Sequence, residues 1–517
     1  MDNDEEFRRT IRIRMSISTQ CRRMNSDLRF LIVAFDGLRA DLIGPGLTPN
    51  LWRLKAAGVT LASHRTVYPS ETRAAFPSLV TGATTARHGM VGNAYVDRSV
   101  TPPRYIDSSD AILLRRLDLE SGGRLYSALS LGEILAANGR SLGVLSTNTP
   151  GTTRLFHHKA EEFGHVRLSG HFREVCTPDD VLAEVEARIG PPSAAPPNTE
   201  PDTVGQEWIT TAFLDIVWPR YRPDVTVLSY GEPDITSHFH GTGAEPTRSI
   251  ITHCDRQFGR VLDWWEAEGR GAGVQIIAIS DHGHITGHTR TSVSMSLRAA
   301  GFSPGIAPAR DVNVVVVPGQ VGALYLADPN DTNVASLVAT ITAAPWCGPV
   351  FTRAKDEVRG IAPGSFSNRL VYADHARAPD VTFSFRSDDT IDPFGLVGGT
   401  FYDSAHPTGL GLHGGLHPKE LAAVGIIAGS VFASDSVSSI PSGICDFAPT
   451  ILHLLGIRAP PSMSGRILNE VARTGRPPPE PTVRGETFEA RLGDYRQVLR
   501  RVAVESTTYV ESGIAES

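Results

Sequence analysis

Residues 29–37 read RFLIVAFDG, an apolar run that ends in an Asp-Gly pair. Three more short runs, at 142–146, 225–229 and 274–279, have the apolar and β-branched character of strands buried in a parallel sheet. Between the strand candidates, apolar residues recur three or four positions apart from Ile250 to Trp265, as on one face of a helix. This alternation predicts an α/β fold with a mostly parallel central sheet flanked by helices.

The chain divides by composition into a polar N-terminal tail at 1–27, a large domain at 28–470, and a Pro-rich linker with a polar tail at 471–517. Residues 311–389 hold the strand-like runs VNVVVV, ALYLA and VTFSF and the helical pattern SLVATITAA. They predict a small α+β cap subdomain inserted into the main domain. The five prolines of residues 191–201 predict a surface loop. In the C-terminal tail we expect one helix.

Composition narrows the function classes. The 517 residues are 41% apolar, and the net charge is -7 with acidic and basic residues mixed throughout. No concentrated basic surface is expected, so nucleic-acid polymers are not predicted partners. The five cysteines are scattered singly, which predicts neither a thiolate zinc site nor a disulfide framework. No signal peptide or membrane-length apolar run is seen, so we expect no membrane contact and a cytoplasmic location.

Acidic residues follow three of the strand candidates. Asp36 ends the first, Asp234 lies shortly after the second, and Asp281 with His282 ends the last. Carboxyl ends of strands in an open α/β sheet meet at the ligand crevice, where three carboxylates would repel one another unless cations lay between them. One aspartate after a strand is usually a turn or a helix cap. The three together, with an adjacent histidine, favour a cation site.

Two further segments carry candidate chemistry. In GEPDITSHFHG, Asp234 and His238 are four residues apart, on one face of a helical turn, whereas the spacing of His240 suits this less. In VYPSETRAAFPSLVTG, the pattern predicts a helix over 72–81 whose N-terminus would attract a phosphate. Thr72 is then either a capping hydroxyl or, with metal ligands beside it, an activated nucleophile.

The ordered motifs resemble the alkaline phosphatase superfamily, and within it the type I phosphodiesterase/nucleotide pyrophosphatase family, over about residues 29–468. The motifs are DGLR, TPNL, PSETRAAFPSLVTG, HGMVGN, EPDxxxH, SDHG and HGG, followed by ICDFAPTILHLLGI and MSGRIL. Several motifs in one order are far more specific than any one of them.

The resemblance implies a two-metal site with a threonine nucleophile. One metal would be held by Asp36, Asp281, His282 and Thr72, and the other by Asp234, His238 and His413. His417 is the alternative to His413, and Asn93 would donate to a phosphate oxygen. Imidazole and carboxylate ligands suit two zinc ions, although manganese or iron takes the same donors.

The implied reaction is hydrolysis of a small phosphate ester through a phosphothreonine intermediate. Family members that cleave nucleotide diesters usually follow the nucleophilic threonine with Phe-Pro-Asn, whereas this chain has Arg73, Ala74 and Ala75. The diester preference is therefore open. The alternatives are a phosphonate hydrolase resembling phosphonoacetate hydrolase, a phosphomonoesterase, a sulfatase of the same superfamily, and a non-catalytic metal-binding relative.

Overall fold

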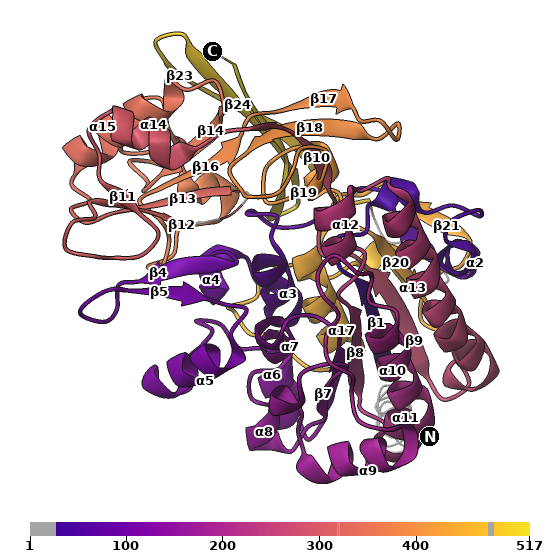
Figure 1. The fold of residues 1–517 in the computed structure, drawn as a ribbon. Helices are drawn as coiled ribbons and strands as arrows, with labels where there is room; N and C mark the ends of the chain where they lie inside the picture. The colour runs from indigo at the N-terminus through magenta and orange to yellow at the C-terminus, as the bar shows by residue number, and fades with distance from the viewer. Residues whose placement is uncertain (1–26, 318, 320, 474–479, 517) are drawn as a thin grey trace, which may run out of the picture.

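A computed structural model of the protein describes residues 27–317, 319, 321–473 and 480–516. Its centre is an eight-stranded sheet (Figure 1). The strand order is β21 (Ser436–Ser438), β2 (Val59–Leu61), β20 (Gly425–Ala428), β9 (Val274–Ile279), β1 (Arg29–Phe35), β8 (Val225–Tyr230), β6 (Leu142–Ser146) and β7 (Arg167–Ser169). The five strands from β9 to β7 are parallel, and β20 is antiparallel to its neighbours. The predicted α/β fold and its four strands are confirmed.

Helices cover both faces of this sheet because its strands are apolar on both sides. On β1, Phe30 and Ile32 pack in one buried cluster, and Leu31 and Val33 pack in the other. The first cluster includes α3 (Thr72–Thr81), α7 (Pro150–Phe156) and α17 (Phe447–Leu454). The second includes α2 (Pro49–Ala57), α10 (Val204–Ala212) and α13 (Glu245–Trp264). The helix predicted from the 250–265 periodicity is therefore part of α13.

A smaller unit lies beside the main sheet (Figure 1). Its six-stranded sheet has the order β11 (Pro304–Gly305), β12 (Val314–Val317), β13 (Val321–Leu326), β16 (Val381–Phe385), β14 (Cys347–Thr352) and β15 (Phe366–Ser367). Helices α14 (Val293–Ala299) and α15 (Asp331–Thr342) pack on it. The strands and the helix expected within 311–389 are all present.

Next to that unit, a four-stranded sheet has the order β17 (Ser387–Ile391), β18 (Val397–Tyr402), β10 (Ile285–Arg290) and β19 (Gly411–Leu412). Strand β10 follows the 281–284 segment, and β19 precedes His413. This sheet therefore anchors two stretches that carry candidate metal ligands.

No helix forms within residues 480–516, so the expectation of a helix in the C-terminal tail is wrong. Residues 483–516 form the antiparallel strands β23 (Val483–Leu492), β24 (Tyr495–Val504) and β25 (Thr507–Glu516). Two-residue turns join them, at Gly493-Asp494 and Glu505-Ser506, with positive φ at Gly493 and Glu505. Tight turns of this kind match the twist of paired strands. The tail reads as polar because one side of this sheet is solvated.

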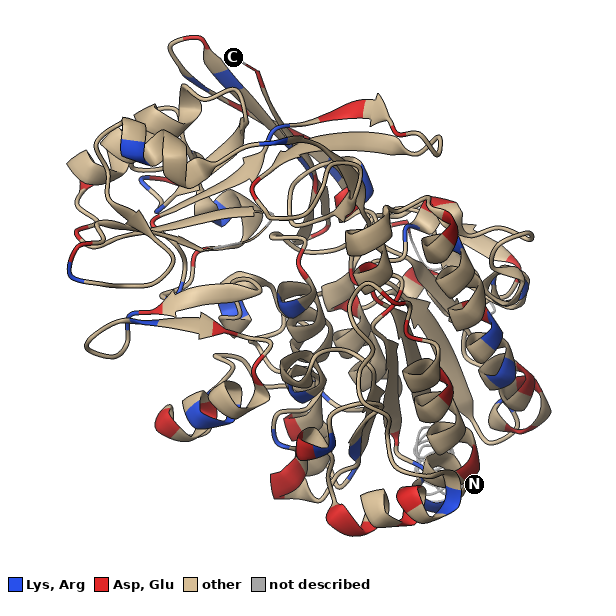
Figure 2. Cartoon of the chain, viewed as in Figure 1, with Lys and Arg blue, Asp and Glu red and all other residues tan. Residues whose placement is uncertain are grey.

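Other expectations concern the surface and the termini. The 191–201 segment contains no helix or strand, as predicted, while the polar tail at 1–26 lies outside the described residues. Within the described ranges, no helix has both the length and the apolar character needed to cross a membrane. Figure 2 shows acidic and basic residues interspersed along helices such as α5 (Ala111–Glu120) and α13.

Candidate active site

The candidate residues converge where strands β1, β8 and β9 end. Asp36 follows β1, and its N–H donates to the carbonyl of Tyr230, the last residue of β8. Asp234 begins the helix α12 (Asp234–His240), and its N–H donates to the Asp36 carbonyl at 3.0 Å. Asp281 follows β9 and is fully buried. Adjacent parallel strands thus bring three distant aspartates together, as predicted.

Asp36 lies between an amide and the threonine hydroxyl. Its Oδ2 accepts a 2.5 Å hydrogen bond from Asn148 Nδ2, and its Oδ1 faces the Thr72 hydroxyl at 3.4 Å. Asn148 follows β6, and its own Oδ1 accepts from the hydroxyls of Ser146 and Ser229. These bonds fix the orientation of the amide, so Oδ1 is the Asp36 oxygen left to face the site.

The Asp281-His282 pair is oriented by backbone groups. Asp281 Oδ1 accepts from the N–H groups of Gly37 and His282, both at 3.0 Å. Asp281 Oδ2 is 3.3 Å from His282 Nε2 and makes no hydrogen bond within the described residues. His282 Nε2 is also 3.2 Å from the Thr72 hydroxyl and 3.6 Å from Asp36 Oδ1. The four residues predicted to share the first metal therefore lie together.

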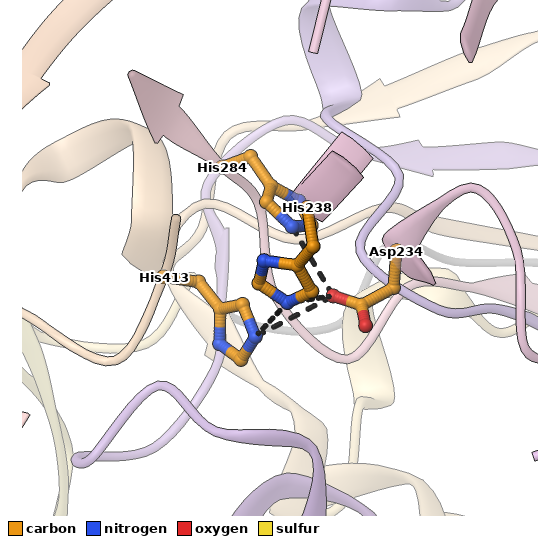
Figure 3. A group of neighbouring side chains, drawn as sticks. All are labelled: Asp234, His238, His284 and His413. Carbon is orange, nitrogen blue, oxygen red and sulfur yellow. Dashed lines mark hydrogen bonds and ion pairs between the residues drawn. The ribbon is translucent and has the colours of Figure 1, made fainter. Parts of the chain in front are cut away.

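A second cluster surrounds Asp234 Oδ1 (Figure 3). The Nε2 atoms of His284, His238 and His413 lie 3.1, 3.3 and 3.4 Å from this oxygen. Together these four residues form a group able to hold a metal ion, and Asp36, Asp234 and His282 form a neighbouring one. The rings of His282 and His413 stack at 3.7 Å, so the two clusters are contiguous.

Each of the four histidines presents the same nitrogen to the site. Their Nδ1 atoms lie 2.8–3.1 Å from backbone carbonyls of Gly411, Ser70, Gly283 and Gly37, for His238, His413, His282 and His284 respectively. A carbonyl can only accept, so Nδ1 carries the proton, and in the neutral imidazole Nε2 keeps its lone pair. Histidines that bind metals are oriented in this way.

Burial and mutual repulsion set the charges of the carboxylates. Burial raises the pKa of Asp36 well above its usual range, and the charges of Asp281 and Asp234 add to the effect. Burial likewise raises the pKa of Asp281 to about 7. Burial also opposes ionisation of Asp234, but the neighbouring His238 outweighs it and holds the Asp234 pKa well below normal. Such a site gains stability from added positive charge.

Burial acts on the imidazoles in the opposite direction. It lowers the pKa of His282 to about 4 and that of His413 well below its ordinary value. Neutral imidazoles and carboxylates are the forms that bind divalent cations. Unpaired buried oxygens on Asp234 and Asp281 add to this fit, because a buried charge without a partner is costly. The residues present therefore suit bound divalent cations.

Thr72 is the first residue of α3, as predicted. The helix N-terminus is less open to an anion than the sequence suggested, because the N–H of Arg73 already donates to Asn93 Oδ1 at 3.1 Å. The N–H groups of Ala74 and Ala75 donate to the Glu71 carbonyl. What Thr72 presents to the clusters is chiefly its hydroxyl.

Asn93 lies beside Thr72 and is held by neighbouring residues. Its N–H donates to Glu71 Oε2 at 2.6 Å, and its Oδ1 is occupied by Arg73. The amide is therefore turned so that Nδ2 is the group able to donate to a ligand. Arg73 itself donates from Nε to Ser108 Oγ, which ties its guanidinium to the loop after β5 (Arg104–Asp107).

The competing histidines lie apart from both clusters. His240 Nε2 contacts the Thr199 carbonyl, and His417 accepts the N–H of Lys419 and contacts Asp389. Two participants were not predicted. His284 lies one glycine beyond His282, and Asn148 follows a strand, as the aspartates do. Both positions could have been recognised in the sequence as candidate site residues.

Comparisons with known proteins place the chain in one family. Residues 30–388 match the family described as type I phosphodiesterase / nucleotide pyrophosphatase. The chain is 22% identical to the venom phosphodiesterase of Naja atra over 270 residues, covering 52% of this chain and 28% of that protein. It is 35% identical to bis(5'-adenosyl)-triphosphatase enpp4 of Mus musculus over 259 residues, covering 49% of this chain and 47% of that protein. The chain thus spans less than half the length of each of these two relatives.

Among solved structures, murine ectonucleotide pyrophosphatase / phosphodiesterase 5, as an inactive variant in complex with AMP, has a similar fold. The TM-score is 0.56 at 17% identity, with 84% of this chain and 96% of that chain covered. The alkaline phosphatase-like fold expected from the sequence is thereby confirmed.

Proposed function

Because the chain belongs to the type I phosphodiesterase / nucleotide pyrophosphatase family, we propose that it hydrolyses small phosphate esters with the Thr72 hydroxyl as nucleophile. The observation that carries the proposal is the position of this hydroxyl, 3.2 Å from His282 Nε2 and 3.4 Å from Asp36 Oδ1. A hydroxyl of ordinary acidity needs such neighbours to become reactive.

The proposed metal ligands are those implied by the family resemblance. Asp36, Asp281, His282 and Thr72 would hold one cation, and Asp234, His238 and His413 the other. When bound, the cations would polarise the phosphoryl group and lower the pKa of the nucleophile. Zinc suits the donors best.

The side chains of this protein would then carry the reaction as follows. Asn93 would hold a phosphoryl oxygen through its Nδ2–H group, which the contacts with Arg73 leave available. The Thr72 oxygen would attack phosphorus, the bond to the leaving alcohol would break as that alcohol takes up the threonine proton, and a phosphothreonine would form, which keeps the second ester group when the substrate is a diester. Water would cleave that ester and regenerate the hydroxyl.

The relatives support phosphate ester chemistry by name: one is a venom phosphodiesterase, one a bis(5'-adenosyl)-triphosphatase, and one structural neighbour binds AMP. We propose that the substrate is a small phosphodiester of the nucleotide type. Arg73, in place of the phenylalanine of relatives that cleave diesters, changes the wall beside the nucleophile.

The test is a substrate panel with purified protein supplied with zinc or manganese. Bis-p-nitrophenyl phosphate, p-nitrophenyl phosphate and phosphonoacetate are compared, and bound metal is counted. We expect about two equivalents of metal and fastest turnover of the diester. A phosphonoacetate preference would point to the phosphonate hydrolase alternative, and metal binding without turnover of any substrate would refute the enzyme assignment.

Variants of one helix make the test specific. Thr72→Ala should lower turnover on the order of 10³-fold or more, because the attacking atom is gone. Thr72→Ser keeps the oxygen and should remain active. Thr81→Ala is the matched control, since Thr81 ends the same helix and, among the described residues, its hydroxyl bonds only to the Pro77 carbonyl.

A further inference from the structure

We propose that His284 is a further protein ligand of the cation at Asp234, in addition to His238 and His413. This inference rests on the proposed two-metal function and goes beyond the ligand set that the family resemblance implies. Of the three imidazoles around Asp234 Oδ1, that of His284 lies closest, at 3.1 Å (Figure 3).

The tautomer of His284 is set for metal binding. Its Nδ1 lies 2.9 Å from the Gly37 carbonyl, so Nδ1 is the protonated nitrogen. Its Nε2 is buried and, within the described residues, makes no hydrogen bond, although Asp234 Oδ1 lies close by. His284 Nε2 and Asp234 Oδ1 are then two acceptors that face each other without a proton between them, which is unfavourable. A cation bound by both atoms removes this repulsion.

The surrounding backbone is shaped around this imidazole. Gly37 has φ +69, and a Cβ on it would lie 2.3 Å from His284 Cε1. A Cβ on Gly283 would lie 2.1 Å from the Lys419 carbonyl oxygen. The two glycines therefore allow the 281–284 segment to approach closely enough to bring both His282 and His284 into the site.

With His284 included, the Asp234 cluster offers one carboxylate and three imidazoles. Four ligands of this type are the number that zinc takes in proteins. The cation beside Thr72 would also have four ligands, but one of them is a hydroxyl, a weaker zinc donor than imidazole, so the cation at Asp234 should be bound more tightly.

The experiment compares the wild-type protein with His284→Ala and His284→Gln. Zinc affinity is measured by competition with a chelator, and Co²⁺ replaces zinc so that its visible absorption reports the ligands. In both variants we expect the affinity for one of the two zinc ions to fall by more than about 100-fold. Residues that only orient a ligand typically contribute 10- to 100-fold. The Co²⁺ absorption of that equivalent should change in both.

The control is His64→Ala. His64 is also fully buried, with Nδ1 bonded to Ser442 Oγ and Nε2 without a hydrogen-bond partner in the described structure, but no carboxylate cluster faces it. It should keep both equivalents and the wild-type spectrum. If the spectrum of the His284 variants matches the wild type, or His284→Gln restores the affinity, His284 only positions Asp234 and the inference is refuted.

Failure of the proposed function is separable from this result. If the wild-type protein binds two cations but turns over no phosphate ester, the hydrolase proposal fails, whereas the affinities and spectra still decide the role of His284. If the protein turns over substrate and the spectra do not change, only the inference about His284 fails.

Discussion

Replacing Asn148 by alanine tests whether the hydrogen bond to Asp36 supports metal binding. The bond is 2.5 Å long, its acceptor is a carboxylate, and both partners are buried. Hydrogen bonds to charged groups contribute about 1.5–3 kcal/mol. At about 1.4 kcal/mol per factor of ten in affinity, Asn148→Ala should weaken the binding of one of the two cations by about 10- to 100-fold.

The assay is a two-step zinc titration against a competing chelator. Only the zinc beside Thr72 should bind more weakly, because within the described residues Asn148 hydrogen-bonds to Asp36 and to no member of the Asp234 cluster. Ser229→Ala should have a smaller effect, since the amide keeps its second hydroxyl partner, Ser146.

The control for Asn148→Ala is Asn138→Ala, which makes the same chemical change at the end of α6 (Leu131–Ala137). In the part of the chain that the structure describes, the Asn138 side-chain amide donates only to the Ile134 carbonyl. If both zinc affinities of the folded Asn148→Ala protein stay within about threefold of the control, the argument that this bond orients Asp36 is refuted.

The remaining predictions concern metal removal, stability and pH. Dialysis against a chelator should abolish phosphate ester hydrolysis, and added zinc or manganese should restore it; unchanged turnover in metal-free protein would contradict the metal assignment. Phe76→Ala should lower the free energy of unfolding by about 3–5 kcal/mol in urea titrations, because the buried Phe76 ring packs on Phe156 at 4.5 Å. The exposed Ile112→Ala should change it by less than about 0.5 kcal/mol, and equal effects would contradict the packing argument. Burial raises the pKa of Asp446 from 3.8 to about 6. The folded protein therefore binds a proton that the unfolded chain has lost, and stability falls as pH rises through this window. Asp446→Asn should remove about 2 kcal/mol of that fall, measured as the difference in unfolding free energy between pH 4 and pH 6. A parallel pH profile in wild type and variant would contradict it.

The central sheet was predictable because its strands are short apolar runs with acidic ends. The positions of Asp36, Asp234 and Asp281 follow from that pattern alone, since parallel neighbours end at one edge. The helix that begins at Thr72 was also predictable, but the hydrogen-bond partners of its first N–H groups were not. The contact of Arg73 with Asn93 depends on a loop twenty residues away, which no local pattern describes.

Two features were missed for different reasons. His284 was passed over because metal ligands on one segment were expected at helical spacing or side by side, whereas Gly283 lets an extended segment present His282 and His284 to the same site. The C-terminal strands were missed although Gly493-Asp494 lies between two alternating runs, a recognised hairpin signal. Charged residues on the solvated side, such as Arg500 and Glu511, obscured that alternation.

The last strand, β25, lies close to the chemistry in space despite its distance in sequence. The N–H of Gly513 donates to the carbonyl of Leu416, three residues after His413, and the Tyr509 hydroxyl donates to Asp446. The family match ends at residue 388, before His413 and before β20 of the central sheet. A shortened chain cut at that limit would lack the proposed ligand His413 and would expose the edge of β9, so heterologous expression should retain the residues through β25.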